Sequence, residues 1–425
     1  MKDLIVSIER NGKMVPAGTI SGSDVSDARF QYSEEYLQSL DAYGISLSLP
    51  LQEQPFSPLQ TANYFEGLLP EGFTRRSVAQ WMRVDESDYL SILHGLGREC
   101  LGAVSITEPG EELQASYERV TEEQVRQLAA EGALKSAELV TQSHLSLTGA
   151  SGKVGLYYDK PENTWYLPRG TAPSTHIVKQ SHVRLDAIVT NEQLCLLTAK
   201  RCGITVPDSF IINTGDGSDG EVLFATERFD RIFPAAPKLL HGKPCPLRLH
   251  QEDFAQALGI PSSAKYEQNS DHYMQKMFDV LRQYSTDPIA DQLKLWDIIT
   301  FDYLIGNTDA HIKNFSLLHS SDMKQVRLAP AYDIISTTVY EQSTRDMAFR
   351  IGGALSIDNI TADSFRMAAE QVGLGRKMAM KRFDDMIERF RLALQQSVED
   401  LVAAGYSKAS EIAEQILCIG GIAKY

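Results

Sequence analysis

The chain is poor in cysteine and has no long apolar run. Its five cysteines are odd in number and scattered, and none forms a Cys-x-x-Cys pair. Such a set predicts reduced, mostly buried thiols and excludes a disulfide framework or a cysteine zinc site. No apolar run approaches the roughly 18 residues that a transmembrane helix needs. Residues 1–10 have the pattern of a β-strand and lack that of a signal peptide. We therefore expect a globular, cytoplasmic protein.

Basic residues are also few, because 41 Lys and Arg stand against 56 Asp and Glu and give a formal net charge of −15. A surface this acidic repels a phosphate backbone, so nucleic acid is a poor direct partner unless a basic patch or a basic partner intervenes. Apolar residues make up 43% of the 425 positions, enough for real cores in two or three domains. The composition predicts a folded, multi-domain chain.

The first hundred residues alternate between short β-like pieces and turns. Period-two patterns at residues 4–8 and 15–20 flank Asn11-Gly12, a two-residue hairpin signal. The same period at residues 45–49 predicts a further strand.

A polar, acidic stretch at residues 107–117 contains a Pro-Gly pair and indicates a domain boundary. After it, residues 145–229 are rich in strand patterns, with one helix near residues 191–201. Beyond this part the pattern becomes helical, and residues 291–305 are apolar nearly all round, as in a helix buried in a large core. A β-rich piece followed by a helical piece favours an α+β fold of two lobes with a cleft between them, as in a protein kinase.

Asp309 and Asn314 form the most informative pattern, followed downstream by Asp333. In kinase chemistry one Asp takes the proton of the acceptor hydroxyl, while an Asn and a second Asp hold the Mg²⁺ ions that bridge the phosphates. An Asp-x4-Asn pattern alone arises by chance roughly once in a chain of this size, so the context has to support it. His311 has no second histidine four residues on, so we interpret it as an orienting or packing residue.

A glycine-containing loop is the first candidate for a phosphate contact; its residues are Gly149, Ala150, Ser151, Gly152 and Lys153. Glycines let backbone N–H groups approach phosphate, and the lysine offers a point charge. The loop is not a Walker A box, because the glycines are too close and Val154 stands where Ser or Thr would hold Mg²⁺. A simple glycine hairpin explains it equally well.

Two further residues and one short segment are candidates for nucleotide binding, and each also has a purely structural explanation. Lys179 follows a β-branched strand and could reach phosphates, with Glu192 as its ion-pair partner, although an edge-strand lysine that reaches water is the simpler reading. The segment Glu227-Arg228-Phe229-Asp230-Arg231 could offer backbone groups to an adenine edge or form a salt-bridge cluster.

Together these residues resemble the HipA-type serine/threonine kinases, the toxin components of bacterial toxin–antitoxin modules. The similar blocks run along nearly the whole chain: Leu47-Ser48-Leu49-Pro50-Leu51, Asn63-Tyr64-Phe65-Glu66-Gly67-Leu68-Leu69-Pro70, Gly97-Arg98-Glu99-Cys100-Leu101-Gly102-Ala103-Val104, Leu167-Pro168-Arg169-Gly170, Ser174-Thr175-His176-Ile177-Val178-Lys179, Glu227-Arg228-Phe229-Asp230-Arg231, Gln251-Glu252-Asp253, Asn307-Thr308-Asp309-Ala310-His311-Ile312-Lys313-Asn314-Phe315-Ser316 and Tyr332-Asp333-Ile334-Ile335-Ser336.

The resemblance implies an amino-terminal subdomain at residues 1–110, a β-rich kinase lobe at 111–228 and an all-helical lobe at 229–425. It implies Mg-ATP between the lobes, held by the following groups: the glycine loop and Lys179 on the phosphates, the backbone of Glu227 and Phe229 on adenine, Asp309 as the catalytic base, and Asn314 and Asp333 on Mg²⁺. It also implies that Ser146 is an autophosphorylation site, where added negative charge would push the loop away from ATP.

The implied partners are a small helix-turn-helix antitoxin, which would carry the contact with operator DNA, and a protein substrate such as an aminoacyl-tRNA synthetase. One departure from the family pattern is Ser151, where the loop usually has Gln; it leaves open whether Ser146 or Ser151 is the main autophosphorylation site. Two other functions stay open on the sequence: a catalytically silent kinase-fold scaffold that acts as a co-repressor with the antitoxin, and a small-molecule kinase.

Overall fold

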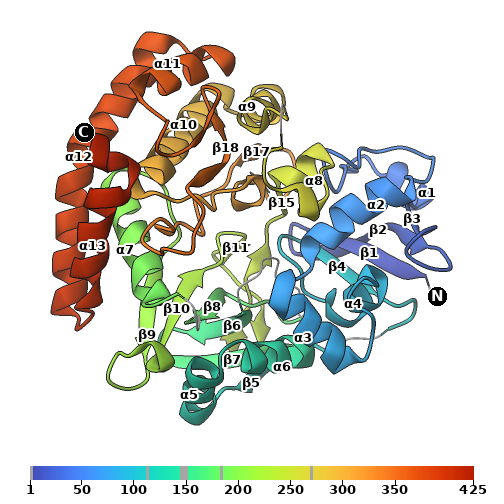
Figure 1. Cartoon of the computed structure of the whole chain (residues 1–425). Coiled ribbons are helices and arrows are strands. Elements are labelled where there is room, and N and C mark those ends of the chain that lie inside the picture. The colour runs from blue at the N-terminus through green and yellow to red at the C-terminus, as the bar shows by residue number, and fades with distance from the viewer. Residues whose placement is uncertain (1–2, 112–113, 144–151, 182–184, 269–270) are drawn as a thin grey trace. The chain divides into compact units, whose positions relative to one another are not determined.

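The computed structural model describes residues 3–111, 114–143, 152–181, 185–268 and 271–425 (Figure 1). The chain forms two compact units. The first unit consists of Met1–Gln180, Ala225–Ser262 and Leu318–Gln325, and the second of Ser181–Phe224, Ser263–Leu317 and Val326–Tyr425. The chain therefore passes between the units several times.

The first unit begins with a four-stranded sheet of order β3-β2-β1-β4. Its strands are β1 (Leu4–Arg10), β2 (Lys13–Ser21), β3 (Arg29–Tyr32) and β4 (Val104–Thr107). Asn11 and Gly12 both have positive φ, 47° and 74°, as a tight turn between twisted strands requires. The hairpin predicted from Asn11-Gly12 is confirmed.

Between β3 and β4 the chain forms the helices α1 (Glu34–Leu37), α2 (Pro58–Phe65), η1 (Glu66–Leu68), α3 (Gly72–Met82) and α4 (Tyr89–Leu96). Of these, α1, α2 and α4 pack on the sheet. The strand predicted at residues 45–49 is wrong, because only one isolated bridge, from Ser46 to Leu49, forms there. The hydroxyl group of Tyr32 accepts from the Ile45 N–H at 2.8 Å and donates to the Leu49 carbonyl at 2.5 Å, so a side chain takes the place of a strand partner.

The larger sheet of the first unit contains β5 (Ser116–Arg119), β6 (Lys153–Asp159), β7 (Thr164–Arg169) and β8 (His176–Gln180), in the order β5-β7-β6-β8. Helix α5 (Glu122–Glu131) leads to α6 (Ala133–Ser143), which packs on β6 and β7. In the antiparallel pairing of β6 with β8, Lys153 lies directly opposite Lys179.

The remaining elements of the first unit are short. They are β11 (Arg231–Ile232), β12 (Leu239–Leu240), β13 (Lys243–Pro244), β14 (Leu247–Arg248), β15 (Gln251–Asp253), α8 (Phe254–Leu258) and η3 (Ser262–Ala264), the last of which ends in the second unit. Strands β10 (Val222–Glu227) and β16 (Ser316–His319) also have residues in both units.

Helices dominate the second unit. They are α7 (Ile188–Arg201), α9 (Tyr273–Tyr284), α10 (Pro288–Ile305), α11 (Ala362–Gln371), α12 (Arg376–Ala403) and α13 (Lys408–Ile419), with the single turns η2 (Asp219–Glu221), η4 (Ile312–Asn314) and η5 (Gly421–Lys424). Helix α12 packs on α7, α10 and α13, and the shorter helix α13 lies beside one part of it (Figure 1). The aromatic core joins Trp296 and Tyr303 of α10 to Phe365 of α11 and Phe383 of α12.

The buried helix predicted at residues 291–305 is confirmed, since most of α10 is inaccessible to solvent. The second unit also contains short strands, β9 (Ser209–Asn213), β17 (Val326–Leu328), β18 (Asp346–Ile351) and β19 (Ala354–Ser356). The expectation of helices alone beyond residue 229 is therefore wrong in detail.

Among the described residues, no helix is long and apolar enough to span a membrane. The five cysteines are free, and three of them are buried.

Candidate active site

A glycine ends the long buried helix and sets the direction of the loop that carries Asp309. Gly306 has φ 76°, and a Cβ atom there would lie 2.0 Å from Thr338 Oγ1. The backbone N–H groups of Thr337 and Thr338 both donate to the Gly306 carbonyl at 3.1 Å. This close approach requires glycine, and it ties the start of the loop to the segment that follows Asp333.

Two buried residues fix the backbone at Asp309. Asn307 donates from Nδ2 to Asp302 Oδ1 at 2.9 Å, and its Oδ1 accepts from the Asp309 N–H at 3.2 Å. Burial raises the pKa of Asp302 to about 7, although the hydrogen bond from Asn307 acts in the opposite direction. The Asp309 side chain itself is exposed. An acid presented from a rigid element to the surface is suited to taking a proton from a bound hydroxyl group.

Asn314 lies in contact with the backbone of Asp309. Its Nδ2 donates to the Asp309 carbonyl at 3.0 Å, and this fixes the plane of the amide group with the donor end turned toward Asp309. The Oδ1 atom is the other end of the same group, and it is a hard oxygen of the kind that Mg²⁺ prefers.

Asp333 has a left-handed backbone, with φ 58°. Aspartate tolerates this conformation better than most residues, but it is uncommon outside turns and functional sites. The neighbouring Tyr332 donates from its hydroxyl group to the Lys313 carbonyl at 2.9 Å and shares a 2.6 Å hydrogen bond with Ser316 Oγ. Because Lys313 precedes Asn314, this tyrosine connects the Asp333 segment to the Asn314 turn.

The side-chain oxygens of Asn314 and Asp333 suit Mg²⁺ better than a metal ion whose ligands all come from the protein. No group of three or more His, Cys, Asp or Glu side chains gathers around a possible metal position anywhere in the described part of the chain. Mg²⁺ is commonly bound through one or two protein oxygens together with substrate phosphates and water. One amide oxygen and one carboxylate, from Asn314 and Asp333, match that requirement.

The candidate phosphate ligands Lys153 and Lys179 lie in the first unit, side by side. They are register partners on β6 and β8, and each is only 8% exposed. Gly152 is buried just before β6. Ser146, Gly149, Ala150 and Ser151 fall outside the described residues.

The segment from Glu227 to Arg231 contains both exposed and buried groups. Glu227 forms a partly exposed ion pair with Lys160 at 2.5 Å, and Phe229 is half-buried. A buried ion cluster, in contrast, joins Glu99 to Arg228, Asp230 and Arg231. For these residues of the segment, the salt-bridge alternative is confirmed. Glu192 is buried on α7 in the second unit.

His311 packs against Tyr266, whose hydroxyl group donates to Asp309. This is the packing role expected of a lone histidine. Tyr266 is not indicated by any sequence pattern, and neither is Asn191, which binds the backbone of Ser336. Their partners lie far away in the chain, and the only local signal was the position of Asn191 at the start of a predicted helix.

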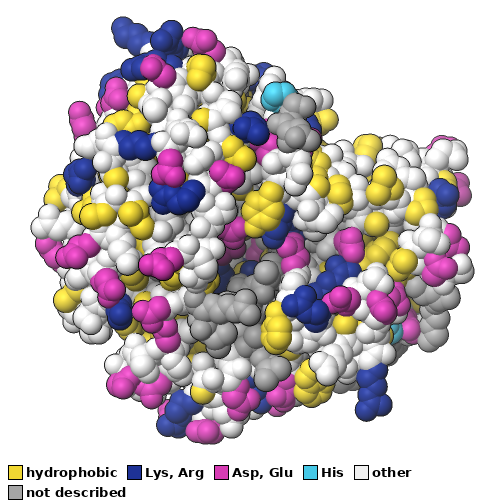
Figure 2. All heavy atoms as spheres, viewed as in Figure 1, with side chains coloured by type: hydrophobic (Ala, Val, Ile, Leu, Met, Phe, Trp, Pro, Cys, Tyr) yellow, Lys and Arg dark blue, Asp and Glu magenta, His cyan; other side chains and the backbone are white. Residues whose placement is uncertain are grey.

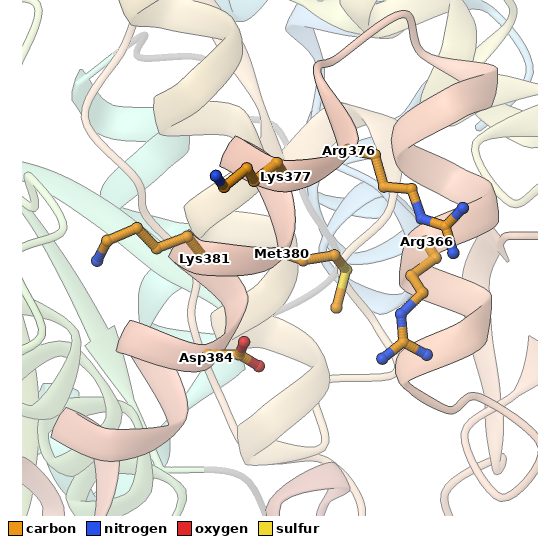
Figure 3. Close-up of a pocket in the computed structure, with 6 residues that line it drawn as sticks. All are labelled: Arg366, Arg376, Lys377, Met380, Lys381 and Asp384. Carbon is orange, nitrogen blue, oxygen red and sulfur yellow. The ribbon is translucent and has the colours of Figure 1, made fainter.

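A shallow hollow of about 540 Å³ is lined by residues of α11 and α12, and none of the predicted site residues is among them. Lysine and arginine side chains gather there, at the top of the face in Figure 2. Figure 3 shows that Lys377 and Lys381 point to one side while Arg366 and Arg376 lie on the other. The cationic groups therefore do not converge on one point.

Comparison with protein-family models identifies both parts of the chain. The HipA-like C-terminal domain matches residues 145–394, and the HipA N-terminal domain matches residues 11–107. The chain belongs to the HipA family. The putative kinase Y4mE of Sinorhizobium fredii is 30% identical over 406 residues, which cover 93% of this chain and 92% of that protein.

Other HipA relatives agree over a similar length. The serine/threonine-protein kinase toxin HipA of Shewanella oneidensis is 25% identical over 403 residues, covering 90% of this chain and 87% of that protein. A solved structure of Shewanella oneidensis HipA with HipB and operator DNA matches with a TM-score of 0.80 at 22% identity, over 99% of this chain and 97% of that one. The expected α+β, kinase-like fold is confirmed by this match.

Proposed function

We propose that this HipA-family chain is an ATP-dependent serine/threonine protein kinase that acts as a growth-arresting toxin. The observation that supports this most is the hydrogen-bonded connection of three groups in the second unit. Asn314 binds the backbone of Asp309, and Tyr332, next to Asp333, binds the carbonyl of Lys313, next to Asn314. An acid and two oxygen ligands for Mg²⁺ are the parts that phosphoryl transfer requires.

In the proposed reaction the acceptor hydroxyl oxygen attacks the γ-phosphorus of ATP. A bond forms between them, the bond from the γ-phosphorus to the ADP oxygen breaks, and the acceptor proton passes to the carboxylate of Asp309. Asn314 and Asp333 would hold Mg²⁺, which when bound neutralises charge on the phosphates. The chain's own contribution is to position these oxygens on a loop fixed by Asp302, Asn307 and Gly306.

The paired lysines support a phosphate-binding role for β6 and β8. Two buried lysines directly opposite each other place two positive charges on one face of the sheet, and such a pair suits a phosphate anion. We assign Lys153, Lys179 and the loop from Gly149 to Gly152 to the phosphates of ATP. The backbone of Glu227 and Phe229 is assigned to the adenine ring.

The proposed regulation and partners are those that the resemblance to the HipA family implies. Ser146, or the neighbouring Ser151, is the proposed autophosphorylation site and off-switch. A helix-turn-helix antitoxin is the proposed partner, because the matching Shewanella oneidensis HipA was solved with HipB and operator DNA. With a net charge of −15, this chain would meet DNA only through that antitoxin.

A translation component such as an aminoacyl-tRNA synthetase is the proposed target, in the cytoplasm. The proposed domains are residues 1–110, 111–228 and 229–425.

Thermal unfolding with Mg²⁺ and a non-hydrolysable ATP analogue tests the nucleotide site. A ligand that binds only the folded chain raises its stability by RT ln(1 + [L]/Kd), so we expect a rise in Tm that depends on Mg²⁺. Lys179→Met should lose most of that rise. Lys200→Met, which removes an exposed lysine paired with Asp208, should keep it. If the analogue does not stabilise the unaltered chain, the scaffold function becomes the better proposal.

A further inference from the structure

The hydroxyl group of Tyr266 lies against the carboxylate of Asp309. Tyr266 donates a hydrogen bond to Asp309 Oδ1. Its ring meets the ring of His311 edge to face, with centroids 5.3 Å apart and an interplanar angle of 84°. All three residues belong to the second unit. Tyr266 is 40% exposed, so its side chain can turn away without repacking of the core.

The backbone on both sides of Tyr266 is anchored. The Tyr273 hydroxyl group donates to the Ala264 carbonyl at 2.6 Å. On the other side, the Glu267 N–H donates to the Ala348 carbonyl at 2.8 Å. The Glu267 carboxylate in turn accepts from the backbone N–H of Arg350 at 2.5 Å. The chain therefore presents Tyr266 from a fixed position, and the side chain is the part that can move.

The hydrogen bond from Tyr266 to Asp309 is of the same kind as the one that a substrate hydroxyl group makes with a general base. A general base has to approach the acceptor hydroxyl to about 2.6–3.2 Å before it can take the proton. A tyrosine hydroxyl that donates to a carboxylate stands in the same relationship to it as a substrate hydroxyl does.

We propose that the acceptor hydroxyl binds at Asp309 Oδ1, in the place that the Tyr266 hydroxyl group takes, and that Tyr266 is a gate that the acceptor displaces. This proposal rests on the role of Asp309 as the general base. The side chains of serine and threonine are shorter than that of tyrosine. The substrate backbone must therefore pass close to Asp309, where the Tyr266 ring lies, so the whole ring has to leave. The fitting acceptor is a serine or threonine of a protein whose backbone can come this close to Asp309.

Hydrolysis of Mg-ATP without a protein acceptor tests the gate, because water then takes the place of the acceptor. Tyr266→Phe removes the hydrogen bond and keeps the ring, whereas Tyr266→Ala removes both. We expect the hydrolysis rate to rise about ten- to a hundredfold in Tyr266→Phe, the size associated with one hydrogen bond to a charged group. The rise should be larger in Tyr266→Ala, with the KM for ATP unchanged. Tyr284→Phe, at an exposed tyrosine of α9, is the matched control and should leave the rate unchanged.

The variants also separate this proposal from the function on which it rests. In Asp309→Asn/Tyr266→Phe the gain should disappear, because no base remains to be uncovered. If Asp309→Asn hydrolyses ATP as fast as the unaltered chain, the role of Asp309 as base fails. If hydrolysis depends on Asp309 but stays equal or falls in Tyr266→Phe, the gate alone is overturned and Tyr266 supports the base instead.

Discussion

The side-chain amide of Asn191 binds the backbone of Ser336 with both of its ends. Asn191 Nδ2 donates to the Ser336 carbonyl at 2.9 Å, and Asn191 Oδ1 accepts from the Ser336 N–H at 3.1 Å. Asn191 is fully buried on α7. Ser336 follows Asp333 by three residues, so this amide fixes the segment that carries the proposed Mg²⁺ ligand.

Asn191→Ala should therefore lower the stability of the fold and also release the segment that joins Asp333 to Ser336. It leaves a buried N–H and a buried carbonyl without their partner, at a cost of about 1–3 kcal/mol. We expect the affinity for Mg²⁺ and a non-hydrolysable ATP analogue, measured by calorimetry, to fall about fivefold. Gln193→Ala removes a hydrogen bond from the same helix to Ser209 and serves as the control. Equal losses of affinity in both variants would mean that Asn191 acts only through overall stability.

Asp333→Asn removes the proposed metal charge while it keeps a residue that tolerates positive φ. Asp333→Ala would add backbone strain at φ 58°. In Asp333→Asn the nucleotide affinity should fall about tenfold or more when Mg²⁺ is present and stay unchanged in EDTA. An equal affinity with and without Mg²⁺ in both proteins would remove Asp333 from the metal site.

A buried cluster of charges stabilises the first unit. Arg228 binds Asp230 through two hydrogen bonds of 2.9 and 2.8 Å, and Arg231 binds Glu99 at 2.9 Å, all at side chains no more than 2% exposed. Although burial alone would raise it, Arg228 and Arg231 hold the pKa of Glu99 below its usual value. Ionised Glu99 therefore stabilises the fold fully at a pH above the pKa of glutamate in the unfolded chain. This stabilisation is lost as the pH falls through the lower pKa of Glu99 in the folded chain.

Glu99→Gln should lower the free energy of unfolding by about 3–5 kcal/mol, because it leaves an arginine uncompensated in the interior. The matched control is Glu118→Gln, which breaks an exposed pair with Arg169 and should cost about 1 kcal/mol or less. Denaturant titration of both variants measures the difference, and similar losses would contradict the role given to the cluster.

His250 should make the fold sensitive to acid. Burial, and next the neighbouring His319, lower the pKa of His250 to about 3, and its Nε2 bonds the Ile45 carbonyl at 2.8 Å. The unfolded chain takes up this proton near pH 6.5 and the folded chain does not, so stability falls as the pH drops from about 6.5 toward 3, by up to about 1.4 kcal/mol per pH unit. His250→Gln should flatten that slope in pH-dependent unfolding. His241→Asn, at an exposed turn, should leave it unchanged, and an unaltered slope in both variants would contradict the account.

Local patterns predicted the elements whose causes are local. The Asn11-Gly12 hairpin follows from positive φ at both residues, and α10 from an apolar run that ends at a glycine. The alternation at residues 45–49 wrongly predicted a strand. The conformation there depends on a distant residue, because Ser46 donates a 2.5 Å hydrogen bond to Glu252, more than two hundred positions away in the chain. The spacing of Asp309, Asn314 and Asp333 is visible in the sequence. The residues that contact this site from elsewhere in the chain are not visible there, because Asn191 and Tyr266 reach their partners only after folding.

Mass spectrometry of the purified chain before and after incubation with Mg-ATP, beside Asp309→Asn, tests the proposed kinase activity most directly. We expect added phosphate on Ser146 or Ser151 of the unaltered chain and none on the variant. Because an autophosphorylated enzyme could be purified already modified, the starting mass has to be measured as well. A starting mass without phosphate that stays unchanged, or phosphate added equally to Asp309→Asn, would contradict the account.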